Sequence, residues 1–262
     1  MSWKGKKIKS TIISIHLELQ FLSINYIKNI ISIPSKTGIH YHIDIIGNLA
    51  KTGNWFNNLN DDFFKFETII KNTKSFSVNA SLYQNAGATM VQQLAYSLAH
   101  ANEYLNHLNN AVIEKNEITW ESFKVIFNIT VGTNFFFEIA KLRALRILWK
   151  TLASEYNINI NCHILATPTT RNKTLYDYNT NMLRTTTECM SAIIGGANFI
   201  CNLPYDAIYH KDNEFGERIA RNQLLILKHE SYFDKVNNPA EGAYYIESIT
   251  NQLAEKALVL FK

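Results

Sequence analysis

A His-Tyr-His triplet is the first pattern in the chain that could do chemistry, because His40 and His42 share one face of any extended strand. Two imidazoles on one face bind zinc or copper when further ligands converge on them. No cysteine or carboxylate stands at metal-ligand spacing beside this pair, and histidine has many structural roles. The sequence therefore favours structural histidines, and we expect no metal site.

Acidic residues supply two further candidates. Asp61 and Asp62 precede an apolar helical pattern, which favours a helix N-cap over a pair of catalytic acids. Asp206 follows a predicted strand, a position where barrel enzymes place functional groups, but no partner base lies nearby in the sequence. We therefore expect Asp206 to have a structural role in a loop.

Two groups of basic residues could hold an anion. Arg143 and Arg146 stand three residues apart near Glu138, a spacing more typical of a solvated helix face than of a phosphate site. Arg184 precedes three threonines at the start of a predicted helix and could contact an anionic group, although helix capping explains the threonines equally well. The chain contains no P-loop, G-x-G-x-x-G or G-x-S-x-G motif.

The elements that must position these side chains alternate along the chain. Residues 13–21 alternate apolar and polar side chains, which predicts a half-buried strand. Short apolar runs predict further strands at 39–45, 76–82, 124–130, 160–166 and 197–203. Apolar residues at three- and four-residue spacing predict helices at 61–72, 88–108, 134–155, 180–195, 214–230 and 244–261.

Strands alternating with helices predict an α/β fold built from β-α-β units on a parallel sheet. About six such units can be recognised, fewer than the eight of a closed (β/α)8 TIM barrel. The prediction is therefore a TIM-barrel-type fold that is incomplete, with residues 1–38 as an N-terminal extension containing one strand and residues 39–262 as the barrel domain.

Composition narrows the class of protein further. The chain of 262 residues is 47% hydrophobic and has a net charge of +4, which excludes a disordered chain and a nucleic-acid footprint. No uninterrupted apolar run of about 18 residues exists, so no membrane span is predicted. The three cysteines (Cys162, Cys189 and Cys201) lie in apolar runs and are expected to be buried thiols, which favours a cytoplasmic location.

Several blocks, in order, resemble the methylmalonyl-CoA mutase family. They are QNAGA from Gln84, GTNFFFEIAKLRALRILW from Gly132, TTTECMSAIIGGA after Arg184, RIARNQLLILKHES from Arg218 and NPAEGAYY from Asn238. The resemblance runs from about residue 40 to residue 262 and is greatest to the barrel domain of the small, non-catalytic subunit. The cobalamin-binding domain of that family is not recognisable in this sequence, so the chain is expected to be truncated relative to the family and to lack that domain.

The resemblance also implies site residues. Gln84 matches a glutamine near the acyl-CoA, and Lys124 matches an arginine that holds the substrate carboxylate, so both are expected to bind substrate. Lysine keeps the charge there but loses the bidentate fork. Leu165 matches the catalytic histidine and can donate no hydrogen bond to the thioester, so no catalytic residue is expected. His163 would share the strand face with Leu165 but lie too far along it to substitute.

The resemblance therefore implies a small subunit that pairs with a catalytic large subunit, with adenosylcobalamin bound at the level of the holoenzyme and acyl-CoA as a further possible ligand. Neither nucleic acid nor membrane is expected as a partner. Two alternatives stay open. One is a barrel chain that is active with a separately encoded cobalamin domain, and the other is a degenerate remnant without activity.

Overall fold

The computed structural model describes residues 15–18, 39–110, 120, 123–211 and 213–262. Its strands are β1 (Ile15–Glu18), β2 (Ile39–His42), β3 (Ser75–Asn79), β4 (Lys124–Val131), β5 (His163–Pro168) and β6 (Phe199–Ile200). Its helices are α2 (Ile45–Thr52), α3 (Leu59–Thr73), α4 (Ser81–Asn85), α5 (Met90–Leu108), α6 (Phe135–Glu155), α7 (Thr180–Ile194), α8 (Glu214–His229) and α9 (Tyr244–Phe261).

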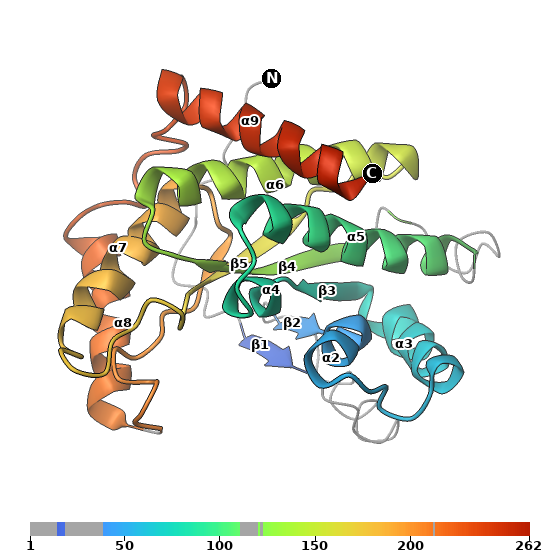
Figure 1. The fold of residues 1–262 in the computed structure, drawn as a ribbon, viewed down its shortest axis with the longest axis horizontal. Helices are drawn as coiled ribbons and strands as arrows, with labels where there is room; N and C mark the ends of the chain where they lie inside the picture. Colours follow the sequence, from blue (N-terminus) through green and yellow to red (C-terminus); the bar gives the residue numbers. More distant parts are fainter. Residues whose placement is uncertain (1–14, 19–38, 111–119, 121–122, 212) are drawn as a thin grey trace.

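Every pair of neighbouring strands is parallel. β1 pairs with β2, and β3, β4, β5 and β6 follow one another in a second ladder. The two ladders meet where the Ser77 N–H donates to the Ile43 carbonyl at 3.1 Å. The Ser75 hydroxyl donates to the Tyr41 carbonyl at 3.4 Å beside it. The described strands therefore lie in chain order, and the predicted α/β fold with a parallel sheet is confirmed (Figure 1).

The sheet is strongly curled. In a flat sheet, β2 and β6 would lie roughly 19 Å apart, at about 4.8 Å per neighbouring pair. Instead, the His40 ring on β2 lies 4.6 Å from the Phe199 ring on β6 and 6.2 Å from the His163 ring on β5. The inner side chains of the second and sixth described strands are therefore in contact across the concave face.

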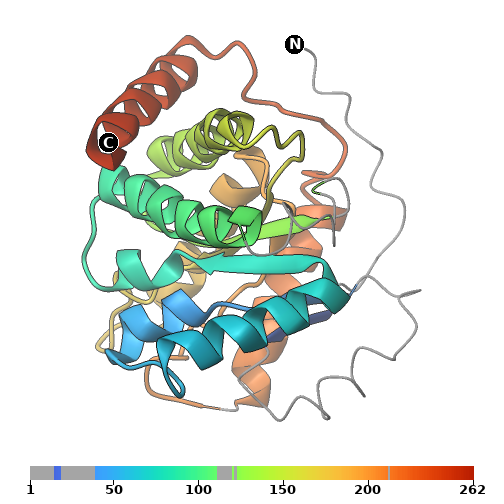
Figure 2. The same cartoon turned by 90° about the vertical axis from the view of Figure 1, so that its right-hand side faces the viewer.

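Helices cover the convex face of the sheet. Figures 1 and 2 show α5 and α6 side by side over β3, β4 and β5, with α9 packed on the outer side of these two helices. Alternate residues of β4 point toward them, because Val125, Phe127, Ile129 and Val131 all belong to the buried core shared with these helices. Trp149 of α6 is 1% exposed in that core, and its indole N–H donates to the Ile160 carbonyl at 2.9 Å. This packing holds the strand ends in fixed positions.

The six predicted helices are found with ends shifted by two residues at most, but two short helices were missed. Residues 43–45 were included in a predicted strand at 39–45. In the structure the strand ends at His42, and Asp44 caps α2 by accepting the Gly47 N–H at 2.7 Å. The predicted strand at 76–82 likewise ends at Asn79, before α4. The strand predicted at 13–21 is described at 15–18, and the rest of that range lies outside the described residues.

Asp61 and Asp62 are not the N-cap that the sequence suggested. Asn58 caps α3, since its side chain accepts the Asp61 N–H at 2.9 Å. Asp62 is fully buried, and its carboxylate accepts the backbone N–H groups of Phe56 at 2.8 Å and Asn57 at 3.2 Å. Asp62 therefore fixes the loop that precedes α3, a structural role of a different kind.

Helix α8 is attached to the rest of the molecule mainly through polar contacts with α7. Gln223 of α8 donates to the Met182 carbonyl at 2.6 Å and to the Thr186 hydroxyl at 2.8 Å. Three large apolar side chains of α8 are about half exposed, namely Phe215, Leu225 and Ile226. Burial of apolar surface is the main source of stability, so this helix is held less firmly than α5 or α6.

The structure bears on the predictions for the cysteines and for membrane spans. The prediction of three buried cysteines was partly wrong. Cys162 and Cys189 are buried, but Cys201 is exposed because β6 ends one residue before it. Burial raises the pKa of the Cys189 thiol to about 12 and that of Cys162 to about 11. No helix among the described residues is long and apolar enough to cross a bilayer.

Gly195 lies at a close approach of α6 and α7. A Cβ atom there would lie 2.9 Å from Leu142 Cδ1 and 3.2 Å from Ile139 Cα. We expect Gly195→Ala to lower the free energy of unfolding by about 1–3 kcal/mol, the usual cost of overpacking. Urea denaturation followed by circular dichroism would measure it. An unchanged midpoint would mean that the two helices separate here without cost.

Candidate functional site

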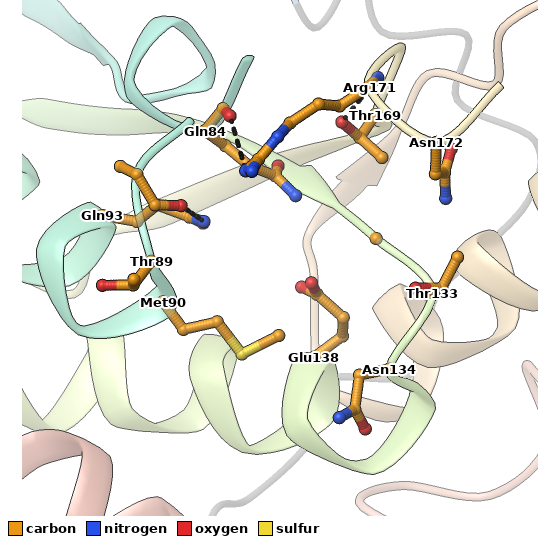
Figure 3. Close-up of a pocket in the computed structure, with 12 residues that line it drawn as sticks. Gln84, Thr89, Met90, Gln93, Thr133, Asn134, Glu138, Thr169, Arg171 and Asn172 are labelled. Carbon is orange, nitrogen blue, oxygen red and sulfur yellow. Dashed lines mark hydrogen bonds between the residues drawn. The ribbon is translucent and has the colours of Figure 1, made fainter. Parts of the chain in front are cut away.

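A pocket of about 300 Å³ lies at the carboxyl ends of β3, β4 and β5. Three segments far apart in the sequence form it, namely α4 with the start of α5, the turn from β4 into α6, and the loop after β5. Figure 3 shows Gln84 and Glu138 pointing into it from opposite sides, with Met90 and Thr133 at its edges. The carboxyl ends of parallel strands are where α/β proteins place their binding sites. This pocket is therefore the candidate site.

A buried ion pair forms the floor of the pocket. Glu138 and Lys141 are each 1% exposed, and Lys141 Nζ lies 2.5 Å from Glu138 Oε2. The ammonium group also donates to Gln93 Oε1 at 3.0 Å and to the Thr130 carbonyl at 2.7 Å. Removing two charges from water is costly, so the pair depends on the attraction between the two charges and on the further acceptors of the lysine. It ties α6 to β4 and α5.

Gly132 keeps the pocket open. It follows β4 directly, and a Cβ atom at this position would lie 3.2 Å from both Gln84 Nε2 and Glu138 Oε1. Any larger residue would push these two side chains apart or fill the space between them. The glycine therefore gives a ligand access to Gln84 and Glu138.

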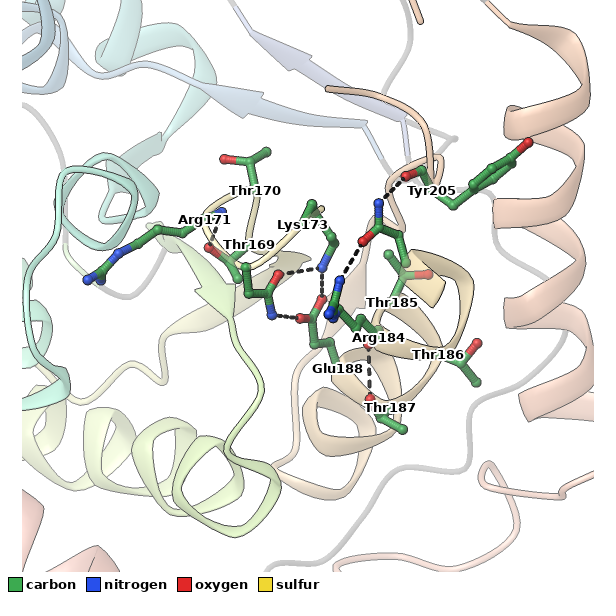
Figure 4. Close-up of polar contacts among 12 residues, drawn as sticks. Thr169, Thr170, Arg171, Lys173, Arg184, Thr185, Thr186, Thr187, Glu188 and Tyr205 are labelled. Carbon is green, nitrogen blue, oxygen red and sulfur yellow. Dashed lines mark hydrogen bonds and ion pairs between the residues drawn. The ribbon is translucent and has the colours of Figure 1, made fainter. Parts of the chain in front are cut away.

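A second buried ion pair stands beside the pocket, on the loop after β5. Lys173 Nζ lies 2.6 Å from Glu188 Oε2 of α7, and the pocket residue Asn172 donates to the same carboxylate (Figure 4). Burial raises the pKa of Glu188, and the attraction of Lys173 only partly offsets it. Burial likewise lowers the pKa of Lys173. The pair fixes the loop that carries Arg171 and Asn172.

A third polar network joins the start of α2 to the end of β3 and to α5. The Asp44 carboxylate accepts hydrogen bonds from His100 Nε2 at 2.8 Å, the Tyr104 hydroxyl at 2.7 Å and the Asn79 N–H at 2.6 Å. Burial alone would raise the pKa of Asp44, but His100 and these hydrogen bonds bring it below its usual value. Burial and the Asp44 charge raise the pKa of Tyr83, whose hydroxyl lies 3.1 Å from His100 Nδ1, to about 12. Tyr83 is therefore neutral at physiological pH.

The concave face of the sheet is polar, in contrast to the convex face. Ser77, Asn128, Thr130 and His163 each have a buried side-chain atom without a hydrogen-bond partner among the described residues. Burial lowers the pKa of His163, and the charges of Lys124 and Arg146 lower it further, so this imidazole is neutral at pH 7. Buried polar groups of this kind are usually satisfied by water or by a ligand.

The structure separates the three residues singled out from the family resemblance. Gln84 is 6% exposed and lines the pocket. Lys124 is the exposed first residue of β4 and lies at the opposite end of that strand, roughly 25 Å from the pocket at about 3.3 Å per residue. Leu165 is 9% exposed on the concave face of β5, beside Asn128, and is not a pocket residue. Lys124 and Gln84 therefore do not form one carboxylate-binding site.

The arginines also differ from the prediction of a solvated helix face. Arg143 donates to Asn238 Oδ1 at 2.7 Å and forms an ion pair with Glu247, which links α6 to α9. Arg146 donates to the Cys162 carbonyl at 3.0 Å and to Asn198 Oδ1 at 2.8 Å. Both side chains therefore tie segments of the fold together and do not form an anion site.

Three further predictions concern Arg184, Asp206 and the histidine pair. Arg184 donates to Asn181 Oδ1 at 2.9 Å, and the threonines that follow it lie inside α7 rather than at its N-cap. Asp206 is 1% exposed and accepts from the Asn213 side chain ahead of α8, which is the loop role predicted for it. His40 and His42 are buried, and the described part of the chain contains no cluster of three residues suited to a metal ion.

The sequence did not reveal the charged residues of the site. Glu138 was assigned to a solvated helix face, yet it is buried with Lys141 three residues later. The one available signal was that both stand within the apolar stripe of α6, where two charges of opposite sign must pair. The pairing of Lys173 with Glu188 could not be predicted from the sequence. Lys173 lies in a loop and Glu188 lies 15 residues later in a helix, and only the folded structure brings the two side chains together.

Comparison with known proteins identifies the family. The family model described as methylmalonyl-CoA mutase matches residues 45–262. The chain is 44% identical over 71% of its length to a methylmalonyl-CoA mutase small subunit of Porphyromonas gingivalis, of which it covers 30%. It is 35% identical over 71% of its length to a small subunit of Propionibacterium freudenreichii subsp. shermanii, and covers 29% of that protein.

A methylmalonyl-CoA mutase of Rhizobium meliloti is 37% identical over 70% of the chain. The chain thus spans less than a third of the length of each of these relatives. The matched region contains every strand and helix from α2 to α9, and with them the whole pocket. The chain belongs to the methylmalonyl-CoA mutase family.

Proposed function

We propose that this chain serves as the small, non-catalytic subunit of a methylmalonyl-CoA mutase. It would pair with a catalytic large subunit that performs the adenosylcobalamin-dependent isomerisation between methylmalonyl-CoA and succinyl-CoA. The observation that carries the proposal is the 44% identity to a protein named as a small subunit, supported by two further relatives of that name.

The concave face of the sheet supports a non-catalytic role. Leu165, at the position expected to match the catalytic histidine of the family, is aliphatic and buried. The rings of His40, His163 and Phe199 occupy the space between β2 and β6. We further propose that the curled sheet is an incomplete (β/α)8 barrel, which the chain-order parallel strands support.

Adenosylcobalamin would belong to the holoenzyme rather than to this chain. A pocket of about 300 Å³ is at the lower end of the range for small-ligand sites and is far too small for a corrin ring with its nucleotide. No step of the reaction is therefore assigned to residues of this chain.

Co-expression with the large subunit tests the proposal. We expect the two chains to elute together at equal stoichiometry, because pairing buries surface that each chain alone exposes. We also expect turnover of methylmalonyl-CoA by the pair with adenosylcobalamin, and none by this chain alone. Separate elution of the two chains would contradict the proposal.

The retained Gln84 in a formed pocket is the observation that favours the alternative, a chain active with a separately encoded cobalamin domain. Turnover with that domain but without the large subunit would establish it. A degenerate remnant would instead show a broad, non-cooperative denaturation curve, whereas the continuous core around Trp149 supports a cooperative one.

A further inference from the structure

Two long helices begin at the pocket and make its rim electropositive. α5 begins at Met90 and α6 at Phe135, and the residues just before them, Thr89 and Asn134, both line the pocket. The Thr89 side chain caps α5, but the Asn134 side chain makes no capping hydrogen bond. The N-terminus of a helix carries roughly half a positive charge, which favours an anion.

The charges of the side chains around the pocket also favour an anion. Glu138 and Lys141 neutralise each other on the floor, and Glu188 and Lys173 do so beside the pocket. Arg171 remains as the excess charge. It is exposed on the rim, and among the described residues its guanidinium donates to the Gln84 carbonyl at 3.3 Å. A guanidinium has five N–H groups, so others can bind a carboxylate.

The Gln84 amide lies deeper in the pocket. Gln84 is 6% exposed, and a Cβ atom at Gly132 would lie 3.2 Å from both Gln84 Nε2 and Glu138 Oε1. Figure 3 shows the Gln84 side chain directed toward the space between Gly132 and Glu138, so this amide nitrogen faces the pocket. A hydroxyl group of a ligand placed there can accept from the amide nitrogen and donate to the carboxylate oxygen.

We propose that this pocket binds a small organic acid that carries a hydroxyl group on the first or second carbon beyond its carboxylate. The carboxylate lies at Arg171, and the hydroxyl accepts from Gln84 Nε2. A volume of about 300 Å³ holds a molecule of this size. This proposal does not depend on the large subunit, so it is tested separately from the assignment of the chain as a small subunit.

Three probes separate the contributions of the two groups. Glycerate carries both the carboxylate and the hydroxyl, propionate carries only the carboxylate, and glycerol carries only hydroxyls. We expect isothermal titration calorimetry on the purified chain to give millimolar or tighter binding of glycerate, at least tenfold weaker binding of propionate, and none of glycerol. Equal binding of glycerate and propionate, or no binding of glycerate at 20 mM, would overturn the proposal.

Two variants and a control locate the binding. Arg171→Gln removes the cation, and we expect it to weaken glycerate binding at least tenfold. Gln84→Met removes the amide donor at nearly constant volume, so glycerate and propionate should then bind alike. Arg221→Gln, on the exposed face of α8, should change neither affinity. Circular dichroism confirms that each variant is folded, and unchanged glycerate affinity in folded Arg171→Gln would refute the assigned site.

Discussion

Replacing Asp44 by Asn is expected to lower the free energy of unfolding by about 3–5 kcal/mol, the usual cost of breaking a buried, hydrogen-bonded charge pair. The Asp44 carboxylate is 10% exposed and joins α2, α5 and the end of β3 through Gly47, His100, Tyr104 and Asn79. An amide offers one acceptor instead of two and turns an N–H group toward these donors. Urea denaturation at pH 7 measures the loss.

The same variant has a distinctive dependence on pH. The pKa of Asp44 in the folded protein is lower than its ordinary value of about 4. Its contribution to stability is therefore complete above about pH 4 and is lost as the pH falls through the folded-state pKa. We expect the difference in stability between wild type and Asp44→Asn to narrow in acid. A constant difference down to pH 2 would contradict the role given to the carboxylate.

Asp61→Asn is the matched control for Asp44→Asn. Asp61 lies in the first turn of α3, exposed, with a side-chain hydrogen bond from Asn58 at 3.0 Å. Exposed contacts of this kind contribute about 0.5 kcal/mol or less. The control should therefore leave the midpoint of denaturation nearly unchanged.

The second large effect is expected at the floor of the pocket. Lys141→Met should lower the free energy of unfolding by about 3–5 kcal/mol, because it leaves the Glu138 carboxylate buried without its cation. The contacts to Gln93 and to the Thr130 carbonyl are lost with it. Lys256→Met, on the exposed side of α9, is the control and should cost less than about 0.5 kcal/mol.

A double variant tests whether the cost arises from the unpaired charge. Adding Glu138→Gln to Lys141→Met removes the buried charge, so we expect the double variant to be more stable than Lys141→Met alone. A double-mutant cycle should give a coupling energy of about 1–3 kcal/mol between the two positions. Additive losses would mean that packing, rather than charge, is what the lysine supplies.

Long helices were predictable from the sequence because their apolar residues repeat at the spacing of one buried face. The residues of α6 that face the sheet, such as Leu145 and Trp149, follow that spacing over five turns. The short helices α2 and α4 were not predictable from spacing. In α2 a single side chain, Asp44, decides between strand and helix by capping Gly47, and α4 has no side-chain cap at all.

The pocket was predictable only in part. The five strands from β2 to β6 and Gln84 could be located from the sequence, because they depend on local pattern and on the family blocks, but the strand ends were misplaced by up to three residues. The partners of Arg143 and Lys173 depend on which segments pack together, which no local pattern encodes. Arg143, for example, pairs with Glu247 more than 100 residues later. Long-range ion pairs therefore marked the limit of prediction for this chain.

The weak attachment of α8 has a consequence for local unfolding. Its contact with α7 depends on Gln223 and few buried apolar side chains, among them Ala220 and Leu227. Segments of this kind open at a lower free energy than the whole molecule does. Amide hydrogens of α8 should therefore exchange with deuterated solvent well before those of α5 and α6, so that the chain opens in at least two steps.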